Sequence, residues 1–162
     1  QEGHAPKSPD RLPAIRVIRK FEGRKFYFTV TMNNGSPYEV FLSTNAHTSA
    51  TNCDIAVEAL EKLLRRHKIA QNLIDEQIEK SKHQANSVKV CRLVSMAMRH
   101  GIDLFKIVKT LVDLDMPVST FIYHLGKVLS EWVPNGTPYD KESGWIFQNG
   151  CVINVVTGES KC

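Results

Sequence analysis

The sequence contains no Cys-x-x-Cys pair, although it holds four cysteines. Cys53, Cys91, Cys151 and Cys162 are widely and irregularly spaced, unlike the ligands of a structural zinc site or the sulfurs of a dithiol motif. A Gly-rich phosphate loop, a His-Glu-x-x-His pair, a nucleophile elbow and paired carboxylates are also absent. We therefore expect no catalytic residues, no metal site and no cofactor, and hence a protein that is not an enzyme.

Long apolar runs are missing as well. None approaches the roughly 20 residues that a membrane-spanning helix needs, and no signal peptide opens the chain. These absences predict a cytoplasmic protein with no membrane partner. The chain begins with Gln1 instead of Met, so we expect a processed or trimmed product with context missing upstream.

In the reducing cytoplasm, free or buried thiols are favoured over a disulfide framework. Cys91 lies within an apolar helical pattern and is predicted to be a core residue, while pairing of Cys151 with Cys162 stays open. The histidines at positions 4, 47, 100 and 124 have no ligand spacing among themselves, so we expect surface or hydrogen-bonded residues there.

The 162 residues suit one domain with a single core. Residues 1–13 hold three prolines and predict an extended arm. Alternation of apolar and polar residues then predicts three antiparallel strands, with Phe26, Phe28 and Val30 on the core face and Tyr27 on the opposite face. The expected strands cover residues 15–20, 25–32 and 38–42, with turns at Glu22-Gly23 and Asn33 to Ser36.

Helical periodicity dominates the rest of the chain. Thr51, Asn52 or Asp54 is expected to cap the first helix, and Gly101 to terminate the third. The expected helices cover residues 55–68, 69–84, 88–100, 102–114 and 119–133, followed by a Pro-rich loop at 134–138 and strand-like pieces at 145–147 and 151–156.

Together these elements predict an α+β fold, with a small antiparallel sheet packed on about three core helices. We divide the chain into an arm (1–13), an α+β domain (14–133) and a tail (134–162). Residues 45–86 are interpreted as an inserted basic helical element that projects from this domain.

The tail resembles the end of cobalamin-dependent (class II) ribonucleotide reductases. It opens with Gly150-Cys151 and closes with the run Gly158-Glu159-Ser160-Lys161-Cys162, at the separation found in that family. The two inner cysteines of the family are Asn154 and Thr157 here, and neither residue supplies a thiolate for zinc binding or dithiol exchange. The resemblance therefore implies a degenerate cysteine tail.

Two further segments resemble the TSCPD domain, the C-terminal module of those reductases. Residues 26–42 are similar to its "YVTV…G-x-P-x-E-V-F-I" strand pair, and residues 91–102 to its "LiSlaLRxGv" helix and glycine stop. The chain lacks the large reductase barrel, so the resemblance implies a fold and an ancestry but no nucleotide reduction.

Two basic clusters are candidate binding sites in this chain of net charge +4. One lies in the insertion, where the alternatives are a phosphate-gripping element and a solvated hairpin whose glutamates pair with the cations. The other lies on the first hairpin, where the alternatives are a single-strand site and a charge-protected edge strand. The candidate residues are Arg65, Arg66, His67, Lys68, Lys80 and Lys82 in the insertion, and Arg16, Arg19, Lys20, Arg24, Lys25 and Tyr27 on the hairpin.

These features favour non-catalytic binding of RNA or single-stranded DNA, because cations accompany aromatic residues and no recognition-helix motif is present. The first alternative is an accessory subunit of a split cobalamin-dependent ribonucleotide reductase, docked on a separate catalytic chain. The second is a protein-interaction or scaffold module.

Overall fold

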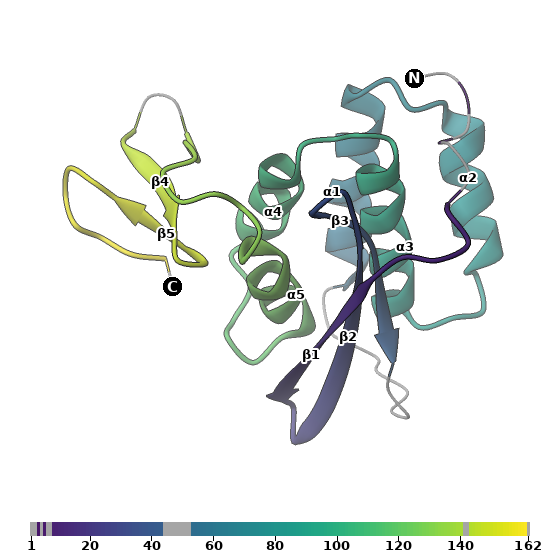
Figure 1. Ribbon diagram of the computed structural model, residues 1–162, viewed down its shortest axis with the longest axis horizontal. Coiled ribbons are helices and arrows are strands. Elements are labelled where there is room, and N and C mark those ends of the chain that lie inside the picture. The colour runs from purple at the N-terminus through teal and green to yellow at the C-terminus, as the bar shows by residue number, and fades with distance from the viewer. Residues whose placement is uncertain (1–2, 4, 6–7, 44–52, 141–142, 162) are drawn as a thin grey trace.

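The computed structural model describes residues 3, 5, 8–43, 53–140 and 143–161. Within them it contains five helices, a three-stranded antiparallel sheet and a two-stranded sheet (Figure 1). The predicted α+β class is confirmed. No helix in this described part is both long enough and apolar enough to cross a membrane.

The three-stranded sheet is a meander of β1 (Ala14–Phe21), β2 (Arg24–Asn33) and β3 (Ser36–Ser43), in the order β1-β2-β3. Both connecting turns place two residues at positive φ, with Asn34 at 52° and Gly35 at 80° in the second turn. Turns of this kind match the twist of the flanking strands, which is why Asn-Gly predicts a hairpin. The predicted meander is confirmed, with each strand one to two residues longer at its ends.

One face of this sheet is buried beneath helices. Phe26, Phe28 and Val30 have no exposed surface, and the ring of Phe28 stacks on Phe121 with a centroid separation of 5.7 Å. The predicted core face is therefore confirmed. A register shift between Thr31 and Met32 ends the regular alternation near the second turn.

The helices are α1 (Cys53–Arg66), α2 (Gln71–Lys80), α3 (Asn86–Arg99), α4 (Leu104–Val112) and α5 (Phe121–Ser130). The α3 helix packs against both β3 and α1. Figure 1 shows α2 at one end of the molecule. The expected cap residues Thr51 and Asn52 lie outside the described residues, and Asp54 lies inside the first turn of α1.

The helix α3 ends just before the glycine that the sequence predicts as its stop. Gly101 adopts a φ of +81°, its N–H bonds to the Met98 carbonyl, and the Ile102 N–H bonds to the Ala97 carbonyl. These two bonds form a Schellman motif, in which a residue without Cβ takes the left-handed position. The predicted glycine stop is confirmed.

The expectation that the inserted element projects is wrong for α1. Leu60 and Leu64 have no exposed surface, and α1 packs against α3 and α4. Its apolar stripe is wide enough for α1 to join the core beside α3, α4 and α5. The α2 helix has the thinner stripe that was expected, with Leu73 and Ile74 as its buried residues.

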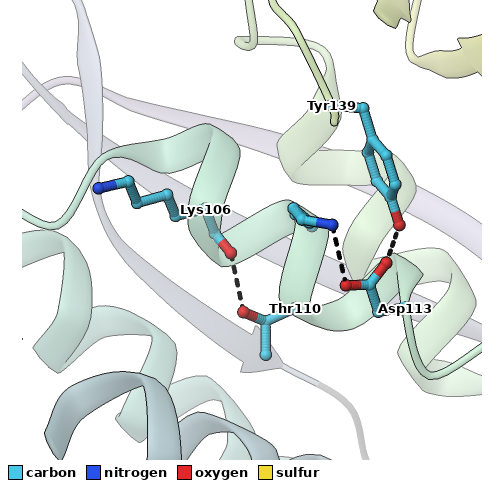
Figure 2. Close-up of polar contacts among 5 residues, drawn as sticks. Lys106, Thr110, Asp113 and Tyr139 are labelled. Carbon is cyan, nitrogen blue, oxygen red and sulfur yellow. Dashed lines mark hydrogen bonds and ion pairs between the residues drawn. The ribbon is translucent and has the colours of Figure 1, made fainter. Parts of the chain in front are cut away.

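The tail forms a hairpin of β4 (Trp145–Gln148) and β5 (Cys151–Asn154), which lies on the far side of α4 and α5 from α2 (Figure 1). Tyr139, just before the hairpin, is buried and donates a hydrogen bond from its hydroxyl to Asp113 beyond the end of α4 (Figure 2). The other Asp113 oxygen accepts from Lys109 Nζ at 3.2 Å. This linkage fastens the tail to the helical layer.

Candidate nucleic-acid interface

The face of the three-stranded sheet opposite the core forms the candidate site, here called the open face. The strand register places its side chains together, since directly opposed residues in an antiparallel pair lie on the same face. Its members are Arg16, Ile18 and Lys20 on β1, Lys25, Tyr27, Thr29 and Thr31 on β2, and Glu39, Phe41 and Ser43 on β3.

Two aromatic rings lie on neighbouring strands of the open face. Phe41 is directly opposite Thr29, so it is diagonal to Tyr27. The Phe41 side chain is 48% exposed, and Ile18, which is opposite Tyr27 on β1, is 50% exposed. The guanidinium of Arg16 lies 4.3 Å from the centroid of the Tyr27 ring. The face thus combines exposed apolar area with a cation held over a ring.

Lys20 and Lys25 extend the positive charge towards the first turn. They are directly opposite each other and both are exposed. Like charges at opposed positions repel, so an anion between them would relieve an unfavourable pair.

The other end of the open face is partly covered by the arm. Ser8 Oγ donates to Glu39 at 3.4 Å, and the Pro13 carbonyl accepts from the Met32 N–H at 2.8 Å. The uncovered part therefore runs from Arg16 towards the first turn.

Arg19 and Arg24 lie on the opposite face of the hairpin from the other predicted cations. Arg19 Nε donates to Nδ1 of His124 at 3.0 Å, and His124 is stacked on Phe21 with centroids 4.2 Å apart. Arg24 is 3.5 Å from Glu22 and 5.7 Å from the ring of Phe26. Both arginines thus have structural contacts, and the open face keeps Arg16, Lys20, Lys25 and Tyr27 of the predicted hairpin set.

The predicted cations of the insertion are split between two places. Arg65 and Arg66 end α1, are exposed, and are followed by His67 and Lys68. Burial lowers the pKa of His67, and the nearby cations Lys106 and Arg66 lower it further. Lys106 of α4 therefore joins this cluster, a contribution from a distant segment that no local pattern could reveal.

Lys80 and Lys82 lie at the end of α2, where each contacts a glutamate. Lys80 Nζ is 3.0 Å from Glu76, and Lys82 Nζ is 2.6 Å from Glu79. Ion pairs between neighbouring turns of this kind are what the solvated-hairpin alternative predicts, and they partly neutralise the positive charge of both lysines. In Figure 1 the end of α1, the end of α2 and the β1–β2 turn lie in three separate regions.

Phe41 is the site residue that the sequence interpretation missed. Val40 and Leu42 follow the core-facing alternation of β3, so the residue between them belongs to the other face. The same out-of-phase argument that selected Tyr27 could have selected Phe41.

The cysteines and histidines do not assemble a site. Cys53 and Cys91 are free and buried, and burial raises the pKa of each thiol to about 12. Cys151 is disulfide-bonded. Cys162, whose pairing with Cys151 the sequence left open, lies outside the described residues. His100 and His124 are buried, whereas positions 4 and 47 lie outside the described part. Among described residues, no three His, Cys, Asp or Glu side chains are grouped to hold a metal.

Asn154 and Thr157 occupy the two turn positions at which the tails of class II ribonucleotide reductases carry cysteine. Asn154 Oδ1 accepts from the N–H groups of Val156 at 2.8 Å and Thr157 at 3.0 Å. Thr157 Oγ1 accepts from the Glu159 N–H at 3.2 Å, and Asn154 Nδ2 donates to the Ser143 carbonyl at 2.9 Å. Side-chain oxygens thus satisfy the turn amides, which explains how the turn can form without thiolates.

The fold and the site define a small α+β module with an open, basic and aromatic sheet face and a docked tail. The chain belongs to the family described as the NrdJ homologue C-terminal domain, whose model matches residues 12–134. This confirms the resemblance to the C-terminal module of class II ribonucleotide reductases. Comparison with curated proteins and with solved structures gives no match.

Proposed function

We propose that this chain binds single-stranded nucleic acid, RNA or DNA, on the open face. The observation that carries the proposal is the pairing of the rings of Tyr27 and Phe41 with three exposed cations, Arg16, Lys20 and Lys25, on one surface. Single-strand sites combine stacking rings with a positively charged path for the backbone, because every base has a π-face and every phosphate a negative charge.

The position of Arg16 indicates where a nucleic-acid base would stack on the open face. Its guanidinium already lies on the Tyr27 ring, so a base can stack on the outer face of this planar cation or replace it on the ring. Phe41 offers a second stacking surface on the neighbouring strand, and a chain with at least two unpaired bases can use both. Lys20 and Lys25 then meet the phosphates near the first turn.

The proposal is tested by fluorescence anisotropy with labelled oligonucleotides of about ten nucleotides, a length within the usual range of single-strand site sizes. RNA and DNA single strands and a DNA duplex are compared at two salt concentrations. We expect both single strands to bind more tightly than the duplex, with affinity falling as salt rises.

The decisive variants are Phe41→Ala and Tyr27→Ala. Each is expected to weaken single-strand binding about tenfold at constant salt, because a stacked base contributes roughly 1–3 kcal/mol per ring. Val118→Ala is the matched control, since this side chain is 62% exposed and does not belong to the open face. Folded ring variants that bind as tightly as the parent would contradict stacking.

A second candidate function is docking on a separate ribonucleotide reductase catalytic chain. Family membership favours it, and so does the exposed apolar area of Ile18 and Phe41. Co-purification with such a catalytic chain, lost in Phe41→Ala, together with no affinity for oligonucleotides, would select this function.

A further inference from the structure

The two edges of the three-stranded sheet differ in how their backbone groups are satisfied. The sheet order β1-β2-β3 makes β1 one edge and β3 the other. At the β3 edge, the hydroxyl of Ser95 in α3 bonds to both the N–H and the carbonyl of Val40. Within the described part of the chain, no such bond is made to the outer edge of β1.

The backbone groups of β1 that point outward follow from the strand register. In an antiparallel pair, residues that bond to the neighbouring strand alternate with residues that do not. The Pro13 carbonyl accepts from the Met32 N–H, and the register then continues unshifted from Ala14 to Phe21. The even-numbered residues of β1 therefore direct their N–H and carbonyl groups away from β2. These residues are Ala14, Arg16, Ile18 and Lys20, and all four are exposed.

Exposed apolar side chains lie on both sides of this edge. Ile18 on the open face is 50% exposed, and Ile15 on the opposite side is 44% exposed. The α5 helix reaches β1 near the first turn, where His124 contacts Arg19 and Phe21. A further strand beside β1 would cover both isoleucines, one on each face of the sheet.

Charge is the feature of β1 that limits its pairing with other strands. The strand has eight residues, contains neither proline nor glycine, and pairs with β2 without a bulge. Proline, bulges and short length are the other common ways in which proteins protect an edge strand. The charged residues of β1 are Arg16, Arg19 and Lys20, with no carboxylate among them. Charge of one sign disfavours pairing with a second copy of β1 and favours an acidic strand.

The positive charge of this edge is not neutralised by carboxylates. Neither Arg16 nor Lys20 forms an ion pair with another described residue. Glu22, two positions beyond Lys20, contacts Arg24 instead, at 3.5 Å. Lys20 is directly opposite Lys25, so an acidic side chain on the outer side of Lys20 would offset this repulsion.

We propose that the edge of β1 binds an extended acidic peptide segment of a partner protein, which adds a fourth, antiparallel strand to the sheet. A peptide backbone offers N–H donors and carbonyl acceptors at the spacing of the outward groups of β1. A phosphodiester backbone has no N–H donor, so this edge selects a peptide. Acidic residues lie opposite Lys20 and Arg16, and an apolar residue between them lies opposite Ile18. The recognised pattern is therefore acidic-x-apolar-x-acidic.

The test uses a fluorescently labelled peptide of sequence Ser-Glu-Thr-Val-Thr-Glu-Val-Ser and measures its fluorescence anisotropy. The parent protein is expected to bind it saturably, with an affinity that falls as salt rises. A peptide with lysine in place of both glutamates should not bind, because its charges repel those of β1.

Two N-methylated peptides of identical composition test the backbone bonds. Methylation of the first valine removes an N–H that faces β1, so it should weaken binding at least about tenfold. Methylation of the threonine that follows this valine changes an N–H that faces away from β1, and it should leave binding nearly unchanged. Equal binding of the two peptides would overturn the proposal.

A matched pair of protein variants tests the same bond from the other side. Ile18→Pro removes an outward N–H and leaves the hydrogen bonds to β2 in place, whereas Ile18→Thr keeps this N–H and a β-branched side chain. Ile18→Pro should weaken peptide binding at least about tenfold, and Ile18→Thr by less than about threefold. Circular dichroism checks that both variants fold, and the N-methylated peptides decide the matter on the parent protein if Ile18→Pro does not.

Phe41→Ala separates this proposal from nucleic-acid binding. Phe41 lies on β3, so the variant should leave peptide binding nearly unchanged while it weakens single-strand binding. A parent protein that binds the oligonucleotide but not the peptide would overturn this proposal alone. A dimer of the free chain that Ile18→Pro converts to a monomer would overturn it as well, because a second copy would then occupy the edge.

Discussion

At the scale of single residues, His124 links a strand of the sheet to a helix. Its ring stacks on Phe21, and its Nδ1 accepts the hydrogen bond of Arg19 from β1. An acceptor nitrogen must be unprotonated, so this contact requires neutral imidazole. Burial and the charge of Arg19 accordingly lower the pKa of His124, although a hydrogen bond to the Val118 backbone opposes the shift.

This lowered pKa predicts that the protein loses stability in mild acid. The unfolded chain takes up a proton at about pH 6.5, where the folded chain does not, so unfolding becomes more favourable as the pH falls below that value. His67 acts in the same direction. Urea unfolding measured between pH 8 and pH 5 should show that the free energy of unfolding falls as the pH falls. His124→Gln should make this pH dependence less steep. An unchanged slope in the variant would assign the loss to other groups.

Asn154 is a second residue whose side chain organises its surroundings. It is 7% exposed, and its amide group makes three hydrogen bonds within the tail. Asn154→Ala is therefore expected to destabilise the protein by about 1–3 kcal/mol, measured by urea unfolding. Asn72→Ala, at an exposed position of α2, is the matched control. Equal stability of the two variants would show that water replaces these bonds.

At the scale of elements, β3 is an edge strand that α3 protects. Val40 directs its N–H and its carbonyl away from β2, and both are satisfied by the hydroxyl of Ser95, at 2.9 and 3.1 Å. Ser95 occupies the serine position of the segment, residues 91–102, that resembles the "LiSlaLRxGv" helix of the TSCPD domain. A single hydroxyl thus fixes the helix on the sheet and leaves no site for another strand at this point.

Ser95→Ala is expected to cost about 1–3 kcal/mol of stability, because it leaves two buried backbone groups without a partner. Thermal and urea unfolding measure the loss, with Ser36→Ala at the exposed start of the same strand as the control. A Ser95→Ala protein as stable as the control would mean that the two groups find another partner.

The tail hairpin is the second informative element. Its turn amides bond to the oxygens of Asn154 and Thr157, which are poor ligands for zinc beside the sulfur donors that structural sites use. We expect purified protein to contain less than one zinc per chain by metal analysis. A stoichiometric metal would instead require a site that includes residues beyond those described.

At the scale of the whole molecule, the two exposed basic surfaces are far apart. The β1–β2 turn and the end of α1 lie at opposite ends of the view in Figure 1. The two surfaces consist of different residues in different parts of the fold, so mutations can test each of them separately.

Two triple variants separate them. Changing Arg16, Lys20 and Lys25 to Glu should abolish binding of a ten-nucleotide strand, since each lost cation removes a phosphate contact. Changing Arg65, Arg66 and Lys68 to Glu should alter the affinity by less than about threefold, and neither change should unfold the protein, because exposed charges contribute little to stability. The reverse pattern would move the site to the end of α1.

The sequence by itself determined the elements that depend on local chemistry. Asn34-Gly35 and Gly101 specify their turns because left-handed φ angles are costly for other residues. Alternation in β2 specifies which side chains enter the core, because successive residues point to opposite faces. Helix ends were less well determined: α5 begins at Phe121 instead of near Ser119, because Thr120 takes the N-cap position and its side-chain oxygen accepts from the Tyr123 N–H.

Only the tertiary structure decided which charged residues share a surface. Strand alternation already separates Arg16 from Arg19, three positions later, but only the packing of distant segments shows that Arg19 bonds to His124, 105 positions away, while Arg16 lies over Tyr27. The same holds for Lys106 beside His67. Local patterns determine secondary structure through steric and periodic rules, whereas a surface depends on how distant segments pack.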